Sequence, residues 1–593
     1  MPAIKIRALP ARLVRLVEDL RRKEDRLALL LSLVIGALVG LVVVAFILLT
    51  GRLTALMYPT GGAGWRRVVV PTLGSLITGY LLFRYFPLAR GSGIPQTRAA
   101  LFIHDGRIAL RSVVGKFVCC CLSLATGHPL GREGPSVYIG SGLASTIARR
   151  LGLSRAQTRS LIPVGGAAAL AAAFNTPIAA VLFSLEEIIG DLHAPVLGSV
   201  VLASAASWMV LHLVLGDNPL FHVPSYHLVN PAELGIYVVL GVVGGLSSVV
   251  FVKLLLWLRA RFAKLPRASL WIQPVAGGLT VGLIGYYMPQ VMGVGYDQVE
   301  RVLNGDVVLK VVVVLAVLKI IATSVAYSSG NAGGIFGPSL FIGAMVGASV
   351  GAVAHQLFPA STAGPGAYAL VGMGVAFAGI IRTPLTSVIM IFELTRDYTI
   401  IVPLMISNLI AFYISQKLQK EPIYEALARQ DGLHLPTRYA RIQWEVPLVS
   451  SATRKAPPSL ALEMTISDAS ERVKDTNLDS WPVSDELGLV GMVRTRHITH
   501  AMDRGRDDMT IERLMQIARR TESDTSVDLP HVHNDQPLSR ALARMRDNGH
   551  KVLPVVSRAN GRIMLGIVTL GDILKAYGVE SAEQLDYTDH PDL

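Results

Sequence analysis

The chain has 593 residues, of which 51% are hydrophobic and 16% charged, and its formal net charge is +13. Soluble domains carry about 25% charged residues. Here the charges are missing from whole blocks: no Asp, Glu, Lys or Arg occurs in 27–51, 160–185, 192–216, 234–252, 268–296, 320–381 or 398–416. Because about 20 apolar residues span a bilayer as a helix, the composition excludes a purely soluble or nucleic-acid-binding protein. It predicts a polytopic membrane protein.

The amino-terminal segment is strongly basic. Eight Lys and Arg residues precede the first apolar block, which is the density that the positive-inside rule gives to cytoplasmic segments. We expect residues 1–27 to form a basic amphipathic helix at the cytoplasmic surface. The apolar run that follows is too long for a cleaved signal peptide, so we expect a plasma or inner membrane location with both termini cytoplasmic.

Residues 28–431 form the expected membrane domain, with at least ten helical segments. Glycine and proline break many of them, in GSGIP at 91–95, GREGP at 131–135, NTP at 175–177, GGIFGP at 333–338 and RTP at 382–384. Irregular backbone at membrane depth is tolerated only where protein buries it or a watery cavity solvates it. The breaks therefore indicate an internal pathway. We interpret the consecutive Cys119, Cys120 and Cys121 as helix-packing residues, and we expect no metal site.

An internal repeat divides this domain. GREGPSVYIG at 131–140 matches GIFGPSLFIG at 334–343, and TPIAAVLFSLEE at 176–187 matches TPLTSVIMIFEL at 383–394. Two matches in the same order and at nearly constant separation indicate two related halves. Paired broken helices in the halves of a membrane protein point to a substrate site near the bilayer midplane.

The glycine-rich breaks lead into helices, and a helix amino terminus exposes unpaired N–H groups with a partial positive charge. Helix starts after 91–95, after Gly131 and after 333–336 could together hold a small anion without a lysine that would bind it too tightly for rapid passage. The alternative for each motif is glycine that allows close helix packing. Ser92 adds a hydroxyl donor at one start, or serves as an ordinary N-cap.

Two carboxylates inside the apolar domain are candidate functional groups, because burying a charge in a membrane is costly. Glu133 stands at a helix start, where it could occupy an anion site when ionised and leave it when protonated. The alternative is a structural pair with Arg132. Glu186 aligns with Glu393 and is expected to cap or pair at a helix end. Glu187 has no such counterpart, so it is the better candidate for a proton relay, the alternative being a solvated surface carboxylate.

GSGIP, GREGP and GGIFGP, in that order, resemble the CLC family of chloride channels and chloride/proton antiporters over roughly 28–431. The resemblance implies an all-α polytopic membrane fold with broken, re-entrant helices and two inverted-topology halves, about 28–216 and 232–419. It also implies a homodimer in the lipid bilayer, in which each subunit has its own anion pathway.

The resemblance assigns roles residue by residue. Ser92, with Gly93, is similar to the serine motif that coordinates chloride, and the backbone N–H groups of Ile335 and Phe336 face the same ion. Tyr424 resembles the inner-gate tyrosine, Glu133 the external gating glutamate and Glu187 the internal proton site. The remaining residues of the pathway motifs are Gly91, Ile94, Pro95, Gly131, Arg132, Gly134, Pro135, Gly334 and Pro338.

These positions favour one subtype. Plant-type nitrate exchangers of the family have proline in place of Ser92, so chloride is expected here, and Glu187 favours coupled exchange with protons. The alternative is a passive voltage- or pH-gated chloride channel on the same scaffold. A cation transporter bearing the same soluble tail is the alternative from another class. An enzyme is not expected, because the apolar domain has no HExxH, no GxSxG and no metal-ligand cluster.

Charges return after about residue 421, and 432–593 reads as a cytoplasmic α/β domain. It resembles a pair of CBS domains, with modules at about 445–505 and 528–578. Thr569 and Asp572 match the motif that such domains use for the ribose and phosphate of an adenine nucleotide. The alternative is that these two residues cap the helix that follows.

Overall fold

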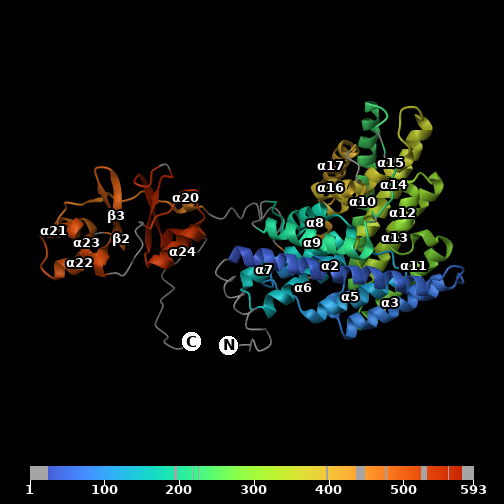
Figure 1. The fold of residues 1–593 in the computed structure, drawn as a ribbon, viewed down its shortest axis with the longest axis horizontal. Helices are drawn as coiled ribbons and strands as arrows, with labels where there is room; N and C mark the ends of the chain where they lie inside the picture. The colour runs from blue at the N-terminus through green and yellow to red at the C-terminus, as the bar shows by residue number, and fades with distance from the viewer. Residues whose placement is uncertain are drawn as a thin grey trace. The chain divides into compact units, whose positions relative to one another are not determined.

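The computed structural model describes residues 24–576 apart from 193–195, 218, 225, 227, 307, 396–398, 434, 436–447, 475, 477, 522–529 and 559. The chain forms two compact units, Met1–Thr437 and Arg438–Leu593 (Figure 1). Residues 1–23 of the expected amphipathic helix lie outside the described part, and 24–27 begin the first described helix.

The first half of the membrane unit follows the charge-free blocks of the sequence. Its elements are α2 (Glu24–Met57), α3 (Arg66–Arg84), η1 (Pro87–Ala89), α4 (Ile94–Phe102), α5 (Leu110–Ala125), α6 (Glu133–Arg150), α7 (Arg155–Phe174), α8 (Pro177–Phe183), the π-helical turn η2 (Ser184–Ile189) and α9 (Leu197–Leu215). The three cysteines are free and buried in α5, as expected for helix-packing residues.

The rest of the membrane unit repeats the pattern of long and short helices and ends with α18, which lies beyond the second half. Its elements are η3 (Pro231–Glu233), α10 (Leu234–Ala263), η4 (Arg267–Ser269), α11 (Gln273–Tyr287), η5 (Pro289–Val291), α12 (Tyr296–Leu303), α13 (Leu309–Ser328), α14 (Phe336–Leu357), α15 (Pro365–Ile381), α16 (Pro384–Thr395), α17 (Ile401–Leu418) and α18 (Ile423–Gln430). The expected all-helical membrane domain with short, broken helices is confirmed.

The two halves make the same helix–helix contact. A Cβ added to Gly140 in α6 would lie 2.3 Å from the Gly165 carbonyl oxygen of α7, and one added to Gly343 in α14 would lie 2.2 Å from the Gly372 carbonyl oxygen of α15. A methyl group fits neither place, so glycine allows each helix pair to pack closely. Because Gly140 and Gly343 are aligned positions of the sequence repeat, the repeat is also a structural one.

The breaks at NTP and RTP are equivalent as well. Asn175 ends α7 with φ of 61°, and Arg382 ends α15 with φ of 66°, both in the left-handed region that stops a helix. Each is followed by Thr-Pro, and the next helix begins at Pro177 or Pro384. Proline suits a first helical position, where its missing N–H costs no intrahelical bond.

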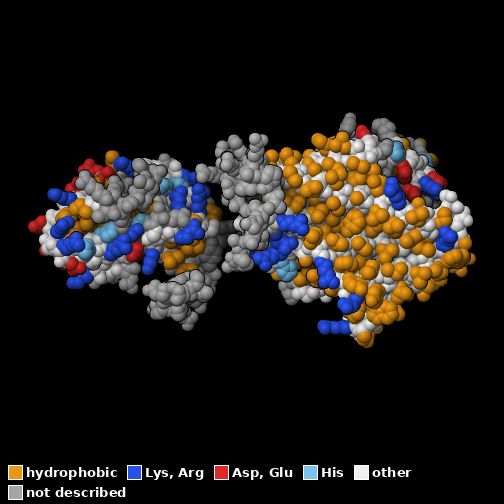
Figure 2. All heavy atoms as spheres, turned by 60° about the horizontal axis from the view of Figure 1, so that its bottom comes forward, with side chains coloured by type: hydrophobic (Ala, Val, Ile, Leu, Met, Phe, Trp, Pro, Cys, Tyr) orange, Lys and Arg blue, Asp and Glu red, His pale blue; other side chains and the backbone are white. Residues whose placement is uncertain are grey.

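The surface of the membrane unit is apolar. In the described part of the chain, six helices are long and apolar enough to cross a membrane by length and composition. Large hydrophobic side chains stand exposed on them, such as Leu213, Val317 and Val402. Figure 2 shows such side chains covering most of one face of this unit, with charged side chains mainly at its margins. An apolar surface of this extent suits lipid rather than water, and the chain is a multi-pass membrane protein.

The first module of the soluble unit is a three-stranded sheet with helices. Strand β1 (Leu460–Ala461) pairs in parallel with β2 (Ser480–Asp485), and helix α21 (Ile466–Val473) makes the crossover between them. Strand β3 (Gly488–Arg494) returns antiparallel to β2. Helices α22 (Thr495–Asp503) and α23 (Ile511–Thr521) follow, and Ile511 of α23 is part of this module's core.

The second module pairs β4 (Val552–Val556) antiparallel with β5 (Met564–Thr569), between helices α24 (Leu538–Asn548) and α25 (Leu570–Ala576). The short helix α20 (Val449–Ala452) lies within the bounds expected for the first module, about 445–505. It packs across the pair, because Val449 lies in the second module's core with Leu538 and Val555.

Candidate functional site

The glycine-rich loops before α6 and α14 are tied together. The Gly131 N–H donates to the Gly334 carbonyl oxygen at 2.7 Å, and the Gly334 N–H donates to the Gly131 carbonyl oxygen at 2.7 Å. This is an antiparallel bridge, so the two loops meet in opposite directions, as halves of inverted topology require. Helix α6 begins two residues after the bridge and α14 also two residues after it. The two helix amino termini therefore approach each other.

The third motif reaches the same place. A Cβ added to Gly134 would lie 2.9 Å from the Ser92 carbonyl oxygen and 3.6 Å from the Gly334 Cα atom. Gly93 is the N-cap of α4, with φ of 99°, and a Cβ there would lie 3.0 Å from the Gly134 carbonyl oxygen. GSGIP, GREGP and GGIFGP thus converge on Gly134, and their glycines allow backbones to touch where side chains would not fit.

Glu133 is fully buried at the first residue of α6. Its Oε2 accepts from the Gly337 N–H at 3.3 Å, and its Oε1 accepts from the Tyr296 hydroxyl. The carboxylate therefore takes an amide at the start of α14, as an anion at that helix end would. Arg132 donates instead to the Ala173 carbonyl oxygen at 3.3 Å. In the described residues Glu133 pairs with Tyr296 and Gly337, not with Arg132.

Two buried hydroxyl groups belong to the candidate anion-binding residues, Ser92 beside the N-cap of α4 and Tyr424 in α18. Within the described part of the chain, neither the Ser92 hydroxyl nor the Tyr424 phenol has a hydrogen-bond partner. The Tyr424 ring packs edge-on against Phe336, the first residue of α14, with ring centroids 6.0 Å apart, and Ile335 is the N-cap of that helix. A buried hydroxyl left unpaired costs about 1–3 kcal/mol, so donors in these positions suit a ligand that accepts hydrogen bonds.

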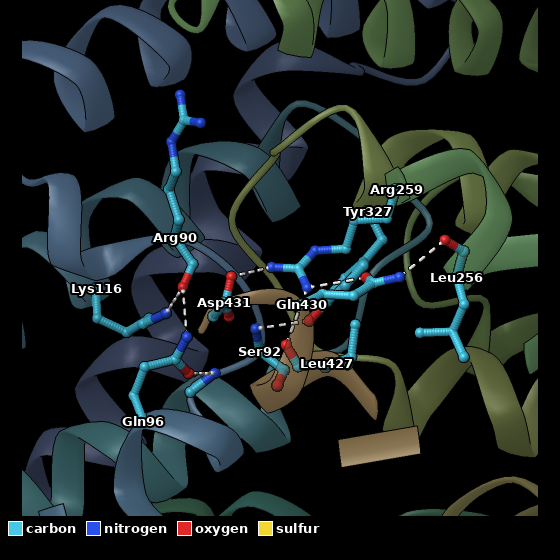
Figure 3. A network of polar contacts seen from close by, with 11 residues as sticks. Arg90, Ser92, Gln96, Lys116, Leu256, Arg259, Tyr327, Leu427, Gln430 and Asp431 are labelled. Atoms are coloured by element: carbon cyan, nitrogen blue, oxygen red, sulfur yellow. Dashed lines mark hydrogen bonds and ion pairs between the residues drawn. The ribbon is translucent and has the colours of Figure 1, made fainter. Parts of the chain in front are cut away.

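The loop that carries Ser92 is held by polar contacts (Figure 3). The Lys116 ammonium donates to the Arg90 and Gly91 carbonyl oxygens, at 2.9 Å each. Gln96 accepts from the Gly93 N–H at 3.1 Å, and the Ser92 N–H donates to the Tyr327 hydroxyl at 3.3 Å. Lys116 is thus engaged with backbone oxygens, and these contacts hold the loop in place.

Helix α18, which carries Tyr424, is anchored at its far end (Figure 3). The Arg259 guanidinium of α10 donates to the Leu427 carbonyl oxygen at 3.1 Å and to Gln430 Oε1 at 3.2 Å, and it pairs with Asp431. Three contacts from one planar guanidinium leave α18 little freedom to turn. Tyr424 is therefore held by its helix rather than by its own hydroxyl.

Glu187 is buried and forms an ion pair with Arg98 of α4 at 2.8 Å. This excludes the alternative of a solvated surface carboxylate. Arg98, itself 2% exposed, also pairs with Glu425 at 3.2 Å. Glu425 is the residue after Tyr424, so the candidate proton site and the helix of the candidate inner gate share one cation.

Glu186 caps a helix, as expected. Its carboxylate accepts from the Thr386 N–H at 2.9 Å and the Thr386 hydroxyl at 2.8 Å, at the start of α16. The aligned Glu393 accepts from the Ile178 and Ala179 N–H groups, at 2.9 and 2.7 Å, at the start of α8. Each half therefore caps a helix of the other half.

Comparison with known proteins agrees with this geometry. The family model described as voltage gated chloride channel matches residues 74–416. The chain belongs to the CLC family. The CBS domain model matches residues 449–504 and 523–579 of the same chain, so the expected CBS pair is confirmed as well.

Relatives of this CLC protein include transporters and a channel by name. The H(+)/Cl(-) exchange transporter ClcA of Vibrio campbellii is 32% identical over 354 residues, which cover 59% of this chain and 76% of the relative. A putative chloride channel protein ClcB-like of Ralstonia nicotianae is 31% identical, and the match covers 63% of this chain and 88% of the relative. A solved slow cyanobacterial Cl−/H+ antiporter is 25% identical with a TM-score of 0.63, covering 68% of this chain and 97% of that one.

Residue-by-residue reading missed two groups of the CLC site. Arg98 is a lone charge in the apolar helix α4, and a buried charge in a membrane helix is a signal for function. Tyr296 had no such signal, because a tyrosine at the end of an apolar block is ordinary. The partners of both residues lie far away in sequence, at Glu187 and Glu133.

The candidate nucleotide residues of the CBS pair contact each other. The Thr569 hydroxyl donates to Asp572 Oδ2 at 2.6 Å, and the Asp572 N–H donates to the Thr569 hydroxyl at 3.2 Å. These bonds cap α25, which is the structural alternative. Asp572 also pairs with Arg454 at 3.3 Å, and Arg454 lines a cavity of about 910 Å³ together with Lys455 and Thr476.

Proposed function

We propose that this CLC protein exchanges chloride for protons across the membrane, with Glu133 as the external gate and Glu187 as the internal proton site. The observation that carries the proposal is the position of the Glu133 carboxylate, which accepts the Gly337 N–H at the start of α14. An ionised carboxylate and a chloride compete for such an amide, whereas a protonated carboxyl does not need it. Chloride entry and Glu133 protonation are then linked.

Several groups would coordinate the dehydrated anion along this pathway. The Ser92 hydroxyl and the Tyr424 phenol supply donors from the inner side, and the N–H groups of Ile335 and Phe336 supply them from α14. All four are neutral dipoles, so they bind the ion less tightly than a lysine would and allow it to leave rapidly. Glu187, buried beside Arg98, supplies the second titratable group that an exchange mechanism needs.

Reconstitution in liposomes tests the proposal. With a chloride gradient imposed, we expect protons to move uphill against their own gradient. A passive voltage- or pH-gated channel, which is the alternative on this scaffold, dissipates chloride without moving protons. Parallel chloride and magnesium fluxes separate both from a cation transporter, which would carry magnesium.

The protein is further proposed to work as a homodimer in a plasma or inner membrane, with both termini cytoplasmic. Family membership and the apolar surface of the membrane unit support this assignment. Cross-linking in liposomes reports the dimer, and protease access to the CBS pair from either side of oriented vesicles reports the topology.

An adenine nucleotide is the proposed ligand of the CBS pair. The cavity of about 910 Å³ has a volume in the range of small-ligand sites, and Arg454 and Lys455 offer charge to a phosphate. Titration of ATP into the full-length protein is expected to give saturable binding that Arg454→Ala weakens at least tenfold. Binding that is absent, or unchanged by Arg454→Ala, would leave Thr569 and Asp572 with only their capping role.

A further inference from the structure

The Glu133 carboxylate is held from the second half by two donors, only one of which is backbone. Gly337 contributes the amide of α14, and Tyr296, the first residue of α12, contributes a phenol. A Cβ added to Gly337 would lie 3.4 Å from the Tyr296 hydroxyl and 3.6 Å from Glu133 Oε1. The three groups therefore meet at one point, and a larger residue at 337 would fill it.

The surroundings of Tyr296 fix its ring. Phe221 packs perpendicular to it with centroids 5.5 Å apart, and the Arg132 guanidinium lies over it at 5.6 Å. The preceding loop is held by the Lys319 ammonium, which donates to the Val291, Gly293 and Val294 carbonyl oxygens at 2.9, 2.7 and 3.1 Å. A phenol positioned in this way points at the carboxylate without first losing rotational freedom.

The charged groups near the gate are engaged elsewhere. Arg132, beside Glu133 on α6, donates to the Ala173 carbonyl of α7, and Lys319 of α13 is used by the loop carbonyls. Tyr424 of α18 packs edge-on against Phe336 and has no bond to Glu133 among the described residues. The described residues of α6, α7, α12, α13, α14 and α18 thus provide no ion pair to Glu133, and the Tyr296 phenol is its side-chain donor.

A hydrogen bond to a carboxylate is stronger than one to the neutral acid, because the acceptor carries the charge. The Tyr296 bond therefore favours the ionised Glu133 in the position where it takes the Gly337 amide. Protonation weakens that bond and frees the side chain to leave. The Tyr296 phenol therefore holds the Glu133 side chain while it is ionised and no longer holds it once it is protonated.

We propose that Tyr296 is a positioning residue of the external gate, whose hydroxyl holds ionised Glu133 in the anion pathway and thereby sets the pH at which chloride transport begins. This rests on the proposed function, because it assigns a partner to the gate that function requires. It adds a residue from the second half to a gate whose carboxylate comes from the first.

The test is Tyr296→Phe in the full-length protein, reconstituted in liposomes, with chloride efflux measured across a pH series. Phenylalanine keeps the ring under Arg132 and removes only the donor. The carboxylate then loses the side-chain donor that holds it in the pathway, so the pH midpoint of chloride transport should rise by about one unit. At low pH the rates of the two proteins should agree.

Tyr368→Phe is the matched control. Its phenol also donates to a carboxylate, Glu233 Oε1, at 2.7 Å. It packs on Gly347, about 15 Å along α14 from Gly337 at 1.5 Å per residue. The midpoint should stay at the wild-type pH in this variant. Incorporating 3-fluorotyrosine at position 296, a stronger donor of the same shape, should lower the midpoint and covers the case in which Tyr296→Phe does not fold.

The Glu133→Gln background distinguishes the role proposed for Tyr296 from the proposed chloride/proton exchange. There the pH dependence of efflux should vanish, and adding Tyr296→Phe should change nothing. An unchanged midpoint in Tyr296→Phe, or an equal effect of that change with and without Glu133, would overturn the role of Tyr296 while leaving the exchange mechanism intact. Proton coupling that survives Glu133→Gln would instead remove the gate itself.

Discussion

At the scale of single residues, one buried cation joins two carboxylates from different helical segments. Arg98 is 2% exposed and lies between Glu187, at 2.8 Å, and Glu425, at 3.2 Å. Desolvating three charges is costly, and the cost is recovered only while the attraction among them is complete. Removing one of the three charges is therefore expected to lower the free energy of unfolding by more than the ion pairs themselves contribute to it.

Arg98→Met should destabilise the membrane unit by about 3–5 kcal/mol, because the buried Glu187 and the partly exposed Glu425 both lose this cation. Thermal unfolding in detergent measures this as a lower midpoint. Arg155→Met is the matched control, since the Arg155–Asp105 pair at 3.3 Å is exposed and such pairs contribute about 0–1 kcal/mol. Equal midpoints for the two variants would contradict the structural role of Arg98.

Residues that carry local signals could be predicted from the sequence. Ser92, Glu133 and Phe336 stand in glycine-rich motifs at helix starts, and the structure places all three where those motifs converge. Their roles in transport stay predictions. Tyr296 could not be predicted, because its importance depends on its hydrogen bond to Glu133, which lies 163 positions away in the sequence.

At the scale of helices, the two halves are joined by exchanged caps. Glu186 accepts from Thr386 at the start of α16, and Glu393 accepts from Ile178 and Ala179 at the start of α8. A carboxylate at a helix amino terminus pairs with free N–H groups and with the helix dipole. This mutual capping of helices explains why both halves of the repeat have a glutamate at this position.

Glu393→Ala should lower the stability of the membrane unit by about 1–2 kcal/mol, because two N–H groups of α8 lose their acceptor. Glu393→Gln, which keeps one oxygen acceptor but no charge, should lose roughly half as much. Unfolding midpoints of both variants in detergent check the order. If the glutamine variant proved as unstable as the alanine variant, charge rather than hydrogen bonding would dominate the cap.

At the scale of the whole molecule, the membrane and soluble units have separate hydrophobic cores. The membrane core includes Phe336 and Tyr368, whereas the soluble modules have cores around Trp481 and around Val555. The charge-free blocks predicted the membrane helices, because each block had to span lipid. They could not predict that Val449 of α20, at the start of the first CBS match, packs with Leu538 and Val555 of the second module, because these residues are far apart in the sequence.

Ending the chain at residue 437 should leave a membrane unit that folds and transports chloride, because its core contains no residue of the soluble unit. Size-exclusion chromatography and chloride efflux from liposomes check this. A truncated protein that aggregates, or that is inactive when folded, would show that the membrane unit needs the CBS pair to fold or to transport chloride.

The central claim is that a carboxylate and a chloride ion compete for the amides at the start of α14. Proton uptake driven by a chloride gradient, compared between wild-type protein and Glu133→Gln in matched liposomes, tests it most directly. The account predicts uphill proton movement in the wild type, and chloride flux without proton movement in Glu133→Gln. Proton pumping that persists in the variant would contradict it.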